Sequence, residues 1–273
     1  MAFDFRNFRL ATIVLFALLL FSSCDKDNND PDDNDIKEDK YTLDHFYSGI
    51  STLKLEVAYE TGAEPIIESG GILGNEPAWN LTKNNIEALF QGRSVETQID
   101  LPLTLQEMTE IPKQKQGDYS SADIKEIADE FRKGVNEGST GNIFILFVDA
   151  YYSSGGERQE NVLGVALGET PYVAIFKPVI NSVSSGSRKN VEQATVIHEV
   201  GHAIGLVNFG LPMTANHQDE DHGKHCTNED CVMYWTVENK SDITDFIGII
   251  NDNEKILFGQ ECLDDARAYQ PEL

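Results

Sequence analysis

The stretch that decides the fold is His198-Glu199-Val200-Gly201-His202-Ala203-Ile204-Gly205. Residues four apart in an α-helix project from the same face, so His198 and His202 can hold one metal ion between them. Glu199 stands beside them, where a carboxylate can take a proton from a metal-bound water. Zinc lowers the pKa of such a water to about 7, which makes a hydroxide nucleophile available at neutral pH. The spacing is the HExxH pattern of zinc hydrolases, and it predicts a zinc site on this segment.

The residues around this motif favour a helix that ends just after the second histidine. Asn190 can cap its start. Gly205 can adopt the positive φ that commonly ends a helix. An apolar stripe opposite the metal-binding side chains is formed by Ile197, Val200 and Ile204. The pattern therefore predicts separate metal and core faces.

Length and charge narrow the possible functions. The chain has 273 residues, 40% of them hydrophobic, which is enough for one sizeable domain with appendages. Its 46 acidic and 21 basic residues give a formal charge of −25. A field of this sign repels nucleic acid and anionic membrane surfaces, so we expect neither as a partner.

The N-terminus has the order of a secretory signal peptide. Arg6 and Arg9 precede an apolar run at residues 10–21, and Ser22-Ser23-Cys24 follows. The small residues before Cys24 resemble a bacterial lipobox, which implies a signal peptide at 1–24, cleavage before Cys24 and lipid attachment to its sulfur. The alternative is an uncleaved N-terminal anchor. In both cases the body of the protein leaves the cytoplasm, and the lipid anchor is its only expected contact with a membrane.

Residues 25–40 contain eight acidic residues and three lysines, with almost nothing apolar. Such a segment cannot bury enough surface to offset its conformational entropy, so we predict a disordered tether. An Asp-rich stretch after a lipidated cysteine is similar to the surface-export signal of Bacteroidetes lipoproteins. That resemblance implies a location in the cell envelope, lipid-anchored to the outer membrane and exposed at the surface.

Residues 41–273 read as a single α+β domain. Alternating or continuous apolar runs predict strands at 53–59, 95–101, 142–150, 162–167 and 172–177. Helical patterns occur at 82–90, 121–135, 190–206 and 260–269, with Thr82 as a cap of the first. We expect a mixed twisted sheet of four or five strands packed on the helices at 121–136 and 190–206, with 172–177 at its edge and the metal at the floor of a cleft.

A catalytic zinc usually has three protein ligands, and the candidates for the third are His217, His222 and His225. His225-Cys226 is followed by four residues, Cys231, one residue and Met233. With the HExxH segment this resembles the archaemetzincins, a branch of the metzincin metalloproteases, whose motif is HExxHxxGxxH-C-x4-C-x-M. It is also similar to a group of predicted zinc-dependent lipoprotein proteases from Bacteroidetes.

The resemblance implies a metzincin-like zincin domain in which each matching residue has a role. His198, His202 and His225 would bind Zn²⁺, Glu199 would be the general base, and Met233 would form the Met-turn. The spacing departs from the family, which has its third histidine where this chain has Asn208, and His225 lies 17 residues further on. His217 therefore remains an alternative third ligand.

The cysteines leave two possibilities open. After Cys24 only Cys226, Cys231 and Cys262 remain, whereas archaemetzincins bind a second, structural zinc with four cysteines. Asp265 stands where the fourth would be, which allows a Cys3Asp site. Outside the cytoplasm the simpler alternative is a disulfide, and Cys226 with Cys231 is the pair we favour.

The resemblance implies a zinc metallopeptidase that hydrolyses peptide or protein substrates lying antiparallel to the edge strand of the sheet. An alternative function of a different class is a surface lipoprotein that binds a partner and holds the metal only to stabilise its fold. A structural site would be closed by four protein ligands and would have no use for Glu199.

Overall fold

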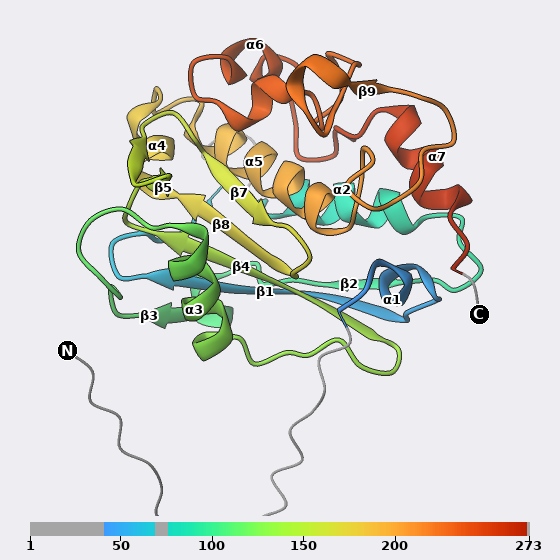
Figure 1. Ribbon diagram of the computed structural model, residues 1–273, viewed down its shortest axis with the longest axis horizontal. Helices are drawn as coiled ribbons and strands as arrows, with labels where there is room; N and C mark the ends of the chain where they lie inside the picture. Colours follow the sequence, from blue (N-terminus) through green and yellow to red (C-terminus); the bar gives the residue numbers. More distant parts are fainter. Residues whose placement is uncertain (1–40, 69–75, 272–273) are drawn as a thin grey trace, which may run out of the picture. The chain divides into compact units, whose positions relative to one another are not determined.

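The computed structural model describes residues 41–68 and 76–271 (Figure 1). The predicted signal peptide with Cys24 and the predicted tether at 25–40 lie outside the described residues. The contacts within the chain place Lys37–Leu273 in one structural unit. Among the described residues, no helix combines the length and the apolar character that crossing a bilayer requires.

A six-stranded sheet with the order β2-β1-β4-β8-β7 lies at the centre, and β3 also pairs with β1. Its pairings are parallel except that of β7 with β8. The mixed sheet is therefore confirmed, with one short strand more than expected. Its strands are β1 (Thr52–Glu60), β2 (Gln98–Asp100), β3 (Thr109–Ile111), β4 (Thr140–Val148), β7 (Gly164–Leu167) and β8 (Tyr172–Phe176).

The strand order corrects one prediction about the edge of the sheet. β8 was expected at the edge, but it lies between β4 and β7. Its five residues are all buried, which is typical of a strand covered on both faces. The edge strand on this side is the antiparallel β7.

β1 is buried on both faces, although its alternating pattern predicts one solvent-facing side. The alternation includes Glu56 and Glu60, which are 7% and 0% exposed. Glu56 accepts hydrogen bonds from the backbone amides of Lys133 and Gly134, and Glu60 accepts from those of Gln114 and Asp149. Buried carboxylates are tolerated where such partners satisfy them.

Helices cover both faces of the sheet. α2 (Asn80–Phe90) and α5 (Arg188–Ala203) lie on one side and α3 (Ser121–Phe131) on the other (Figure 1). The remaining elements are α1 (Leu43–Tyr47), η1 (Leu105–Glu107), β5 (Tyr152–Ser154), β6 (Glu157–Gln159), α4 (Lys177–Ser182), β9 (Gln218–Asp219), η2 (Glu220–His222), β10 (His225–Cys226), η3 (Trp235–Glu238), α6 (Ile243–Ile247) and α7 (Gln260–Ala268).

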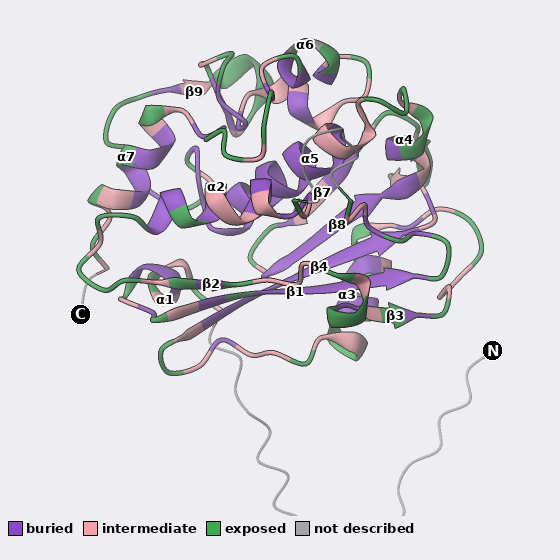
Figure 2. Cartoon of the chain, turned by 180° about the vertical axis from the view of Figure 1, so that it is seen from behind, coloured by how far each residue is buried: buried purple, intermediate pink, exposed green. Residues whose placement is uncertain are grey.

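α5 contains the HExxH segment, and it is buried along most of its length. Every residue from Val191 to Ala203 is buried (Figure 2). The sheet contacts α5 through β7 and β8, while α2, η3 and α6 contact it from other directions. The side of α5 that carries the histidines is therefore covered as well, because C-terminal elements pack over it.

Tertiary contacts explain why several helix boundaries differ from the predicted ones. Asn190 lies inside α5, where its side chain donates to the carbonyl of Ile250 instead of capping the helix. Thr82 lies inside α2, and its hydroxyl donates to the buried Gln193. α3 ends at Phe131, earlier than expected, because the amides of Lys133 and Gly134 are used by Glu56.

The end of α5 agrees with the sequence. Gly205 has φ +92°, and its amide donates to the carbonyl of His202, while the amide of Leu206 donates to that of Gly201. This pair of hydrogen bonds is the Schellman motif, which requires a left-handed residue at Gly205. The chain then forms a loop in which β9 pairs antiparallel with β10. That hairpin brings His225 back toward α5.

Candidate metal centre

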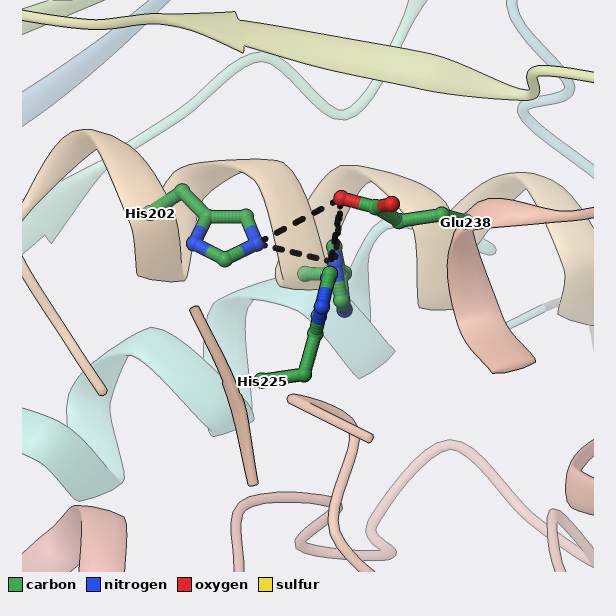
Figure 3. A group of neighbouring side chains, drawn as sticks. His202, His225 and Glu238 are labelled. Atoms are coloured by element: carbon green, nitrogen blue, oxygen red, sulfur yellow. Dashed lines mark hydrogen bonds and ion pairs between the residues drawn. The ribbon is translucent and has the colours of Figure 1, made fainter. Parts of the chain in front are cut away.

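Four side chains converge on one point beside α5. His198 and His202 come from α5, His225 from β10 and Glu238 from the end of η3. Their ligand atoms all lie within 4.8 Å of one another. Nε2 of His198 and Nε2 of His202 are 3.1 Å apart, and Oε1 of Glu238 lies 2.9 Å from Nε2 of His225. Figure 3 shows the Glu238 carboxylate pointing toward His202 and His225.

Hydrogen bonds orient two of the histidine rings for metal binding. Nδ1 of His198 lies 2.6 Å from the carbonyl oxygen of Val232, and Nδ1 of His225 lies 2.5 Å from that of His222. A carbonyl only accepts, so each Nδ1 carries a proton, and Nε2 is the ring atom that lies among the other donors of the cluster. Metal-binding histidines are commonly held in this way.

The protonation of His202 also fits a ligand. Burial lowers its pKa to about 4, in spite of the nearby Glu238 carboxylate. A metal-binding imidazole must be neutral, and this ring is neutral at pH 7. Three imidazoles and one carboxylate are a donor set that suits zinc.

Glu199 lies beside this cluster but is not one of its four donors. It is 1% exposed, and its Oε1 has no hydrogen-bond partner. The backbone amide of Ala166 on the edge strand β7 donates to its carboxylate. Gly164 leaves room for it, because a Cβ there would lie 2.9 Å from Cγ of Glu199. Burial and the Glu238 carboxylate raise the pKa of Glu199 well above its ordinary value.

Met233 packs against α5 within the motif itself. It is fully buried, and a Cβ on Gly201 would come closer to its sulfur than van der Waals contact allows. The preceding carbonyl, Val232, accepts from His198. The Met233 carbonyl accepts from the amide of Cys226, which follows His225. The turn that contains Met233 therefore contacts both segments that supply histidines.

The structure separates the three candidates for the third ligand. His225 joins His198 and His202, whereas His217 lies with the cysteines. His222 is exposed, pairs with Asp219 and stacks on Trp235 with ring centroids 4.3 Å apart. Asn208, at the position expected from the family spacing, is exposed and donates to Gln218.

Glu238 was not predicted from the sequence. Its only sequence signal is its position five residues after Met233, and a single glutamate among 46 acidic residues does not stand out. Glu238 is positioned by pairing of its segment with the start of the edge strand. Its backbone carbonyl accepts a hydrogen bond from the amide of Leu163. The three histidines reach little solvent, since His198 is 0%, His202 5% and His225 7% exposed.

Two hollows on the surface of the described residues lie away from the histidine cluster. The larger one, of about 1090 Å³, is lined by residues such as Asn84, Arg93 and Glu96 and contains no histidine. A smaller one, of about 310 Å³, is lined by residues such as Lys54 and Lys133. Neither hollow brings together a set of groups comparable to the histidine cluster.

A second cluster contains the three cysteines that follow Cys24. Cys226, Cys231 and Cys262 are fully buried and free. Sγ of Cys226 lies 3.3 Å from Nδ1 of His217, and Sγ of Cys231 lies 3.6 Å from Sγ of Cys262. The Cys226–Cys231 disulfide is therefore not formed. A Cys3His set is a common structural zinc site.

Asp265 does not complete that set in the way the sequence indicated. Its Oδ2 lies 2.7 Å from Nε2 of His217, and its Oδ1 accepts from the amide and hydroxyl of Thr214. Carboxylates commonly hold the far nitrogen of a metal-binding histidine in this manner. The Cys3Asp arrangement is thus replaced by a cluster in which His217, Cys226 and Cys262 lie within 4.8 Å of one another and Cys231 contacts Cys262, with Asp265 orienting the histidine ring.

Comparisons with known proteins give only distant similarities. No family model and no curated protein matches the chain. Among solved structures, the chain is similar to the archaemetzincin of Methanopyrus kandleri, with 13% identity and a TM-score of 0.43 over 79% of this chain and 94% of that one. The archaemetzincin of Archaeoglobus fulgidus complexed with malonate gives 13% identity and a TM-score of 0.42 over 78% and 99%. Both similarities are low, so the chemistry of the site has to come from its own residues.

Proposed function

We propose that the protein is a zinc metallopeptidase, anchored by lipid at Cys24 to the outer membrane, with Glu199 as its general base. The observation that carries this proposal is the position of Glu199. A purely structural site has no use for an additional carboxylate, whereas Glu199 is buried beside the donor cluster and hydrogen-bonded to the edge strand.

In the proposed mechanism His198, His202 and His225 would hold the zinc, with their Nε2 atoms nearest the common point. When bound, the metal would act as a Lewis acid that activates water and polarises the carbonyl of the peptide bond to be cleaved. Glu199 accepts a proton from the attacking water and later delivers it to the leaving amine. Burial of the site keeps bulk water away from these proton transfers.

Peptides or proteins are the proposed substrates because of the edge strand. Among the strands at 41–68 and 76–271, β7 pairs with β8 alone, and the amide of Ala166 on β7 reaches Glu199. An extended peptide added along β7 would run next to the general base, which is β-augmentation. The negative charge of the protein gives no reason to expect nucleic acid.

The cysteine cluster supports a second, structural zinc. Its donors Cys226, Cys231, Cys262 and His217 are all buried. A site closed by four protein ligands contributes folding free energy and leaves no position for water. We assign it to holding the loop that precedes β10.

One observation favours the rival function, a binding lipoprotein with a structural metal. Glu238 adds a fourth donor to the histidine cluster, and a closed set of four is typical of structural sites. The binding-lipoprotein function, however, gives no role to Glu199, which is buried against β7.

Glu199→Gln decides between these functions, because the carboxylate acts on the water without binding zinc. The variant should keep zinc and melt at the same temperature as the wild type, while losing at least about 10² in peptide hydrolysis. Digestion of a peptide library by the full-length protein gives the activity, and metal analysis gives the zinc. The matched control is Glu220→Gln, which changes an exposed glutamate of η2. Wild-type rates for Glu199→Gln would refute the mechanism, and a zinc-loaded wild type that cleaves no peptide would support the rival.

A further inference from the structure

The four donor atoms of the histidine cluster have the separations expected around a single ion. Oε1 of Glu238 lies 2.9 Å from Nε2 of His225, 3.6 Å from that of His198 and 3.7 Å from that of His202. Ligands at zinc bond lengths of about 2.0–2.1 Å in a tetrahedron are about 3.3–3.4 Å apart. The Glu238 separations lie on both sides of that value, so its oxygen fits the fourth vertex.

The directions of the donor atoms point to the same arrangement. Nε2 of His225 has no hydrogen-bond partner, although Oε1 of Glu238 is only 2.9 Å away. Two atoms at that distance would form a hydrogen bond if they faced each other. Donors around a metal face the ion instead, which accounts for a short contact without hydrogen-bond geometry.

The backbone around Glu238 is fixed, while its side chain is the most exposed of the four. The Glu238 carbonyl accepts from the amide of Leu163, and the amide of Lys240 donates to the carbonyl of Asn161. These bonds attach the segment to the start of β7. The Glu238 side chain is 37% exposed, whereas those of His198 and His225 are 0% and 9% exposed. Rotation of one side chain therefore suffices to remove the oxygen from the cluster.

We propose that Glu238 is a displaceable fourth metal ligand, which occupies the position of the attacking water and keeps the site closed at rest. Catalytic zinc sites need that position open, whereas structural sites fill it with protein. Glu238 closes the site without removing its base, because Glu199 stays outside the donor set. The activity part of this proposal rests on the proposed peptidase function, but the metal-binding part does not.

Metal binding by the full-length protein tests the ligand directly. The variants are Glu238→Gln and Glu238→Ala, with Glu220→Gln as the matched control. Zinc affinity at the histidine cluster is measured by chelator competition, with the cysteine cluster already loaded. Loss of a ligand should lower the affinity at least about tenfold in Glu238→Ala, since even outer-shell substitutions cost 10–100-fold. Glu220→Gln should match the wild type. Melting temperatures of the zinc-loaded proteins show whether each variant is folded.

Access to the fourth position is tested with azide on protein in which Co²⁺ replaces zinc. Azide should change the visible spectrum of Glu238→Ala at a concentration at least tenfold lower than it needs with the wild type, because it must displace Glu238 in the latter. Peptide hydrolysis per bound zinc should rise in Glu238→Ala for the same reason.

The outcomes separate the two proposals. Unchanged zinc affinity, or equal azide binding in the wild type and Glu238→Ala, overturns the role of Glu238. If both measurements change as expected while no variant and no wild-type sample cleaves peptides, Glu238 is a ligand and the peptidase function is wrong. If Glu238→Ala binds azide more tightly but hydrolyses peptides more slowly per zinc than the wild type, the closing role is overturned.

Discussion

Lys177→Met should destabilise the protein by about 3–5 kcal/mol at pH 8, the usual cost of removing one partner of a buried ion pair. Lys177 starts α4, directly after β8, and its ammonium pairs with Glu192 on α5. Their side chains are 4% and 0% exposed. Without Lys177, the Glu192 carboxylate keeps one backbone partner, the amide of Ile66 at 2.6 Å. This pair attaches the histidine-bearing helix to the end of β8.

The deficit should depend on pH with a definite sign. Burial raises the pKa of Glu192, and Lys177 opposes the shift. In the variant the opposition is gone, so the folded state holds a proton that the unfolded state releases above its ordinary pKa near 4.5. Stability then falls as the pH rises from that value toward the raised folded pKa. The deficit should be smaller at pH 5 than at pH 8.

Urea denaturation of both proteins in the same chelated buffer measures the difference. The double variant Lys177→Met with Glu192→Gln should recover part of the loss, because the neutral amide can still accept from Ile66. A Lys177→Met variant within about 1 kcal/mol of the wild type would refute the cost assigned to an unpaired buried charge. A deficit independent of pH would refute the role of Glu192.

Three further substitutions test the site and the anchor. His225→Ala should weaken zinc binding at the histidine cluster by at least about 10² and abolish hydrolysis. His217→Ala should instead weaken zinc binding at the cysteine cluster and affect the histidine cluster less. Titration with a chelator gives the affinities, and the reverse pattern would contradict the assignment of ligands. Gly201→Ala gains about 1 kcal/mol of helix propensity but costs about 1–3 kcal/mol by overpacking against Met233. Thermal unfolding should therefore show a net loss of stability of about 1 kcal/mol. A stabilised variant would count against that packing. Cys24→Ala should move the protein from the membrane to the soluble fraction, and equal retention would argue against lipidation.

Local patterns predicted the parts of the fold that local physics decides. The continuous apolar run became β4, and the two short runs joined by 168–171 became β7 and β8. Gly205 ended the HExxH helix as expected, because only a few residue types tolerate a positive φ. These features depend on neighbours within a few residues, so the sequence contains them directly.

Most of the errors involve contacts between distant segments. The sequence predicts that Asn190 caps the helix, but its side chain donates to the carbonyl of Ile250 instead. The edge of the sheet was assigned to the wrong strand because strand order depends on which runs pair, and nothing in 172–177 specifies its neighbours. Glu238 enters the cluster 36 residues after His202 only because its segment pairs with residues before β7.

The strand β10 consists of His225 and Cys226, and these neighbours belong to different clusters. Successive side chains of a strand point to opposite sides, so one peptide unit separates the histidine donors from the cysteine donors. Because the two residues share a peptide unit, a displacement of the Cys226 backbone also displaces His225. If both clusters bind zinc, their binding free energies would be coupled through this peptide unit, and zinc at either cluster would change the affinity of the other by the same factor.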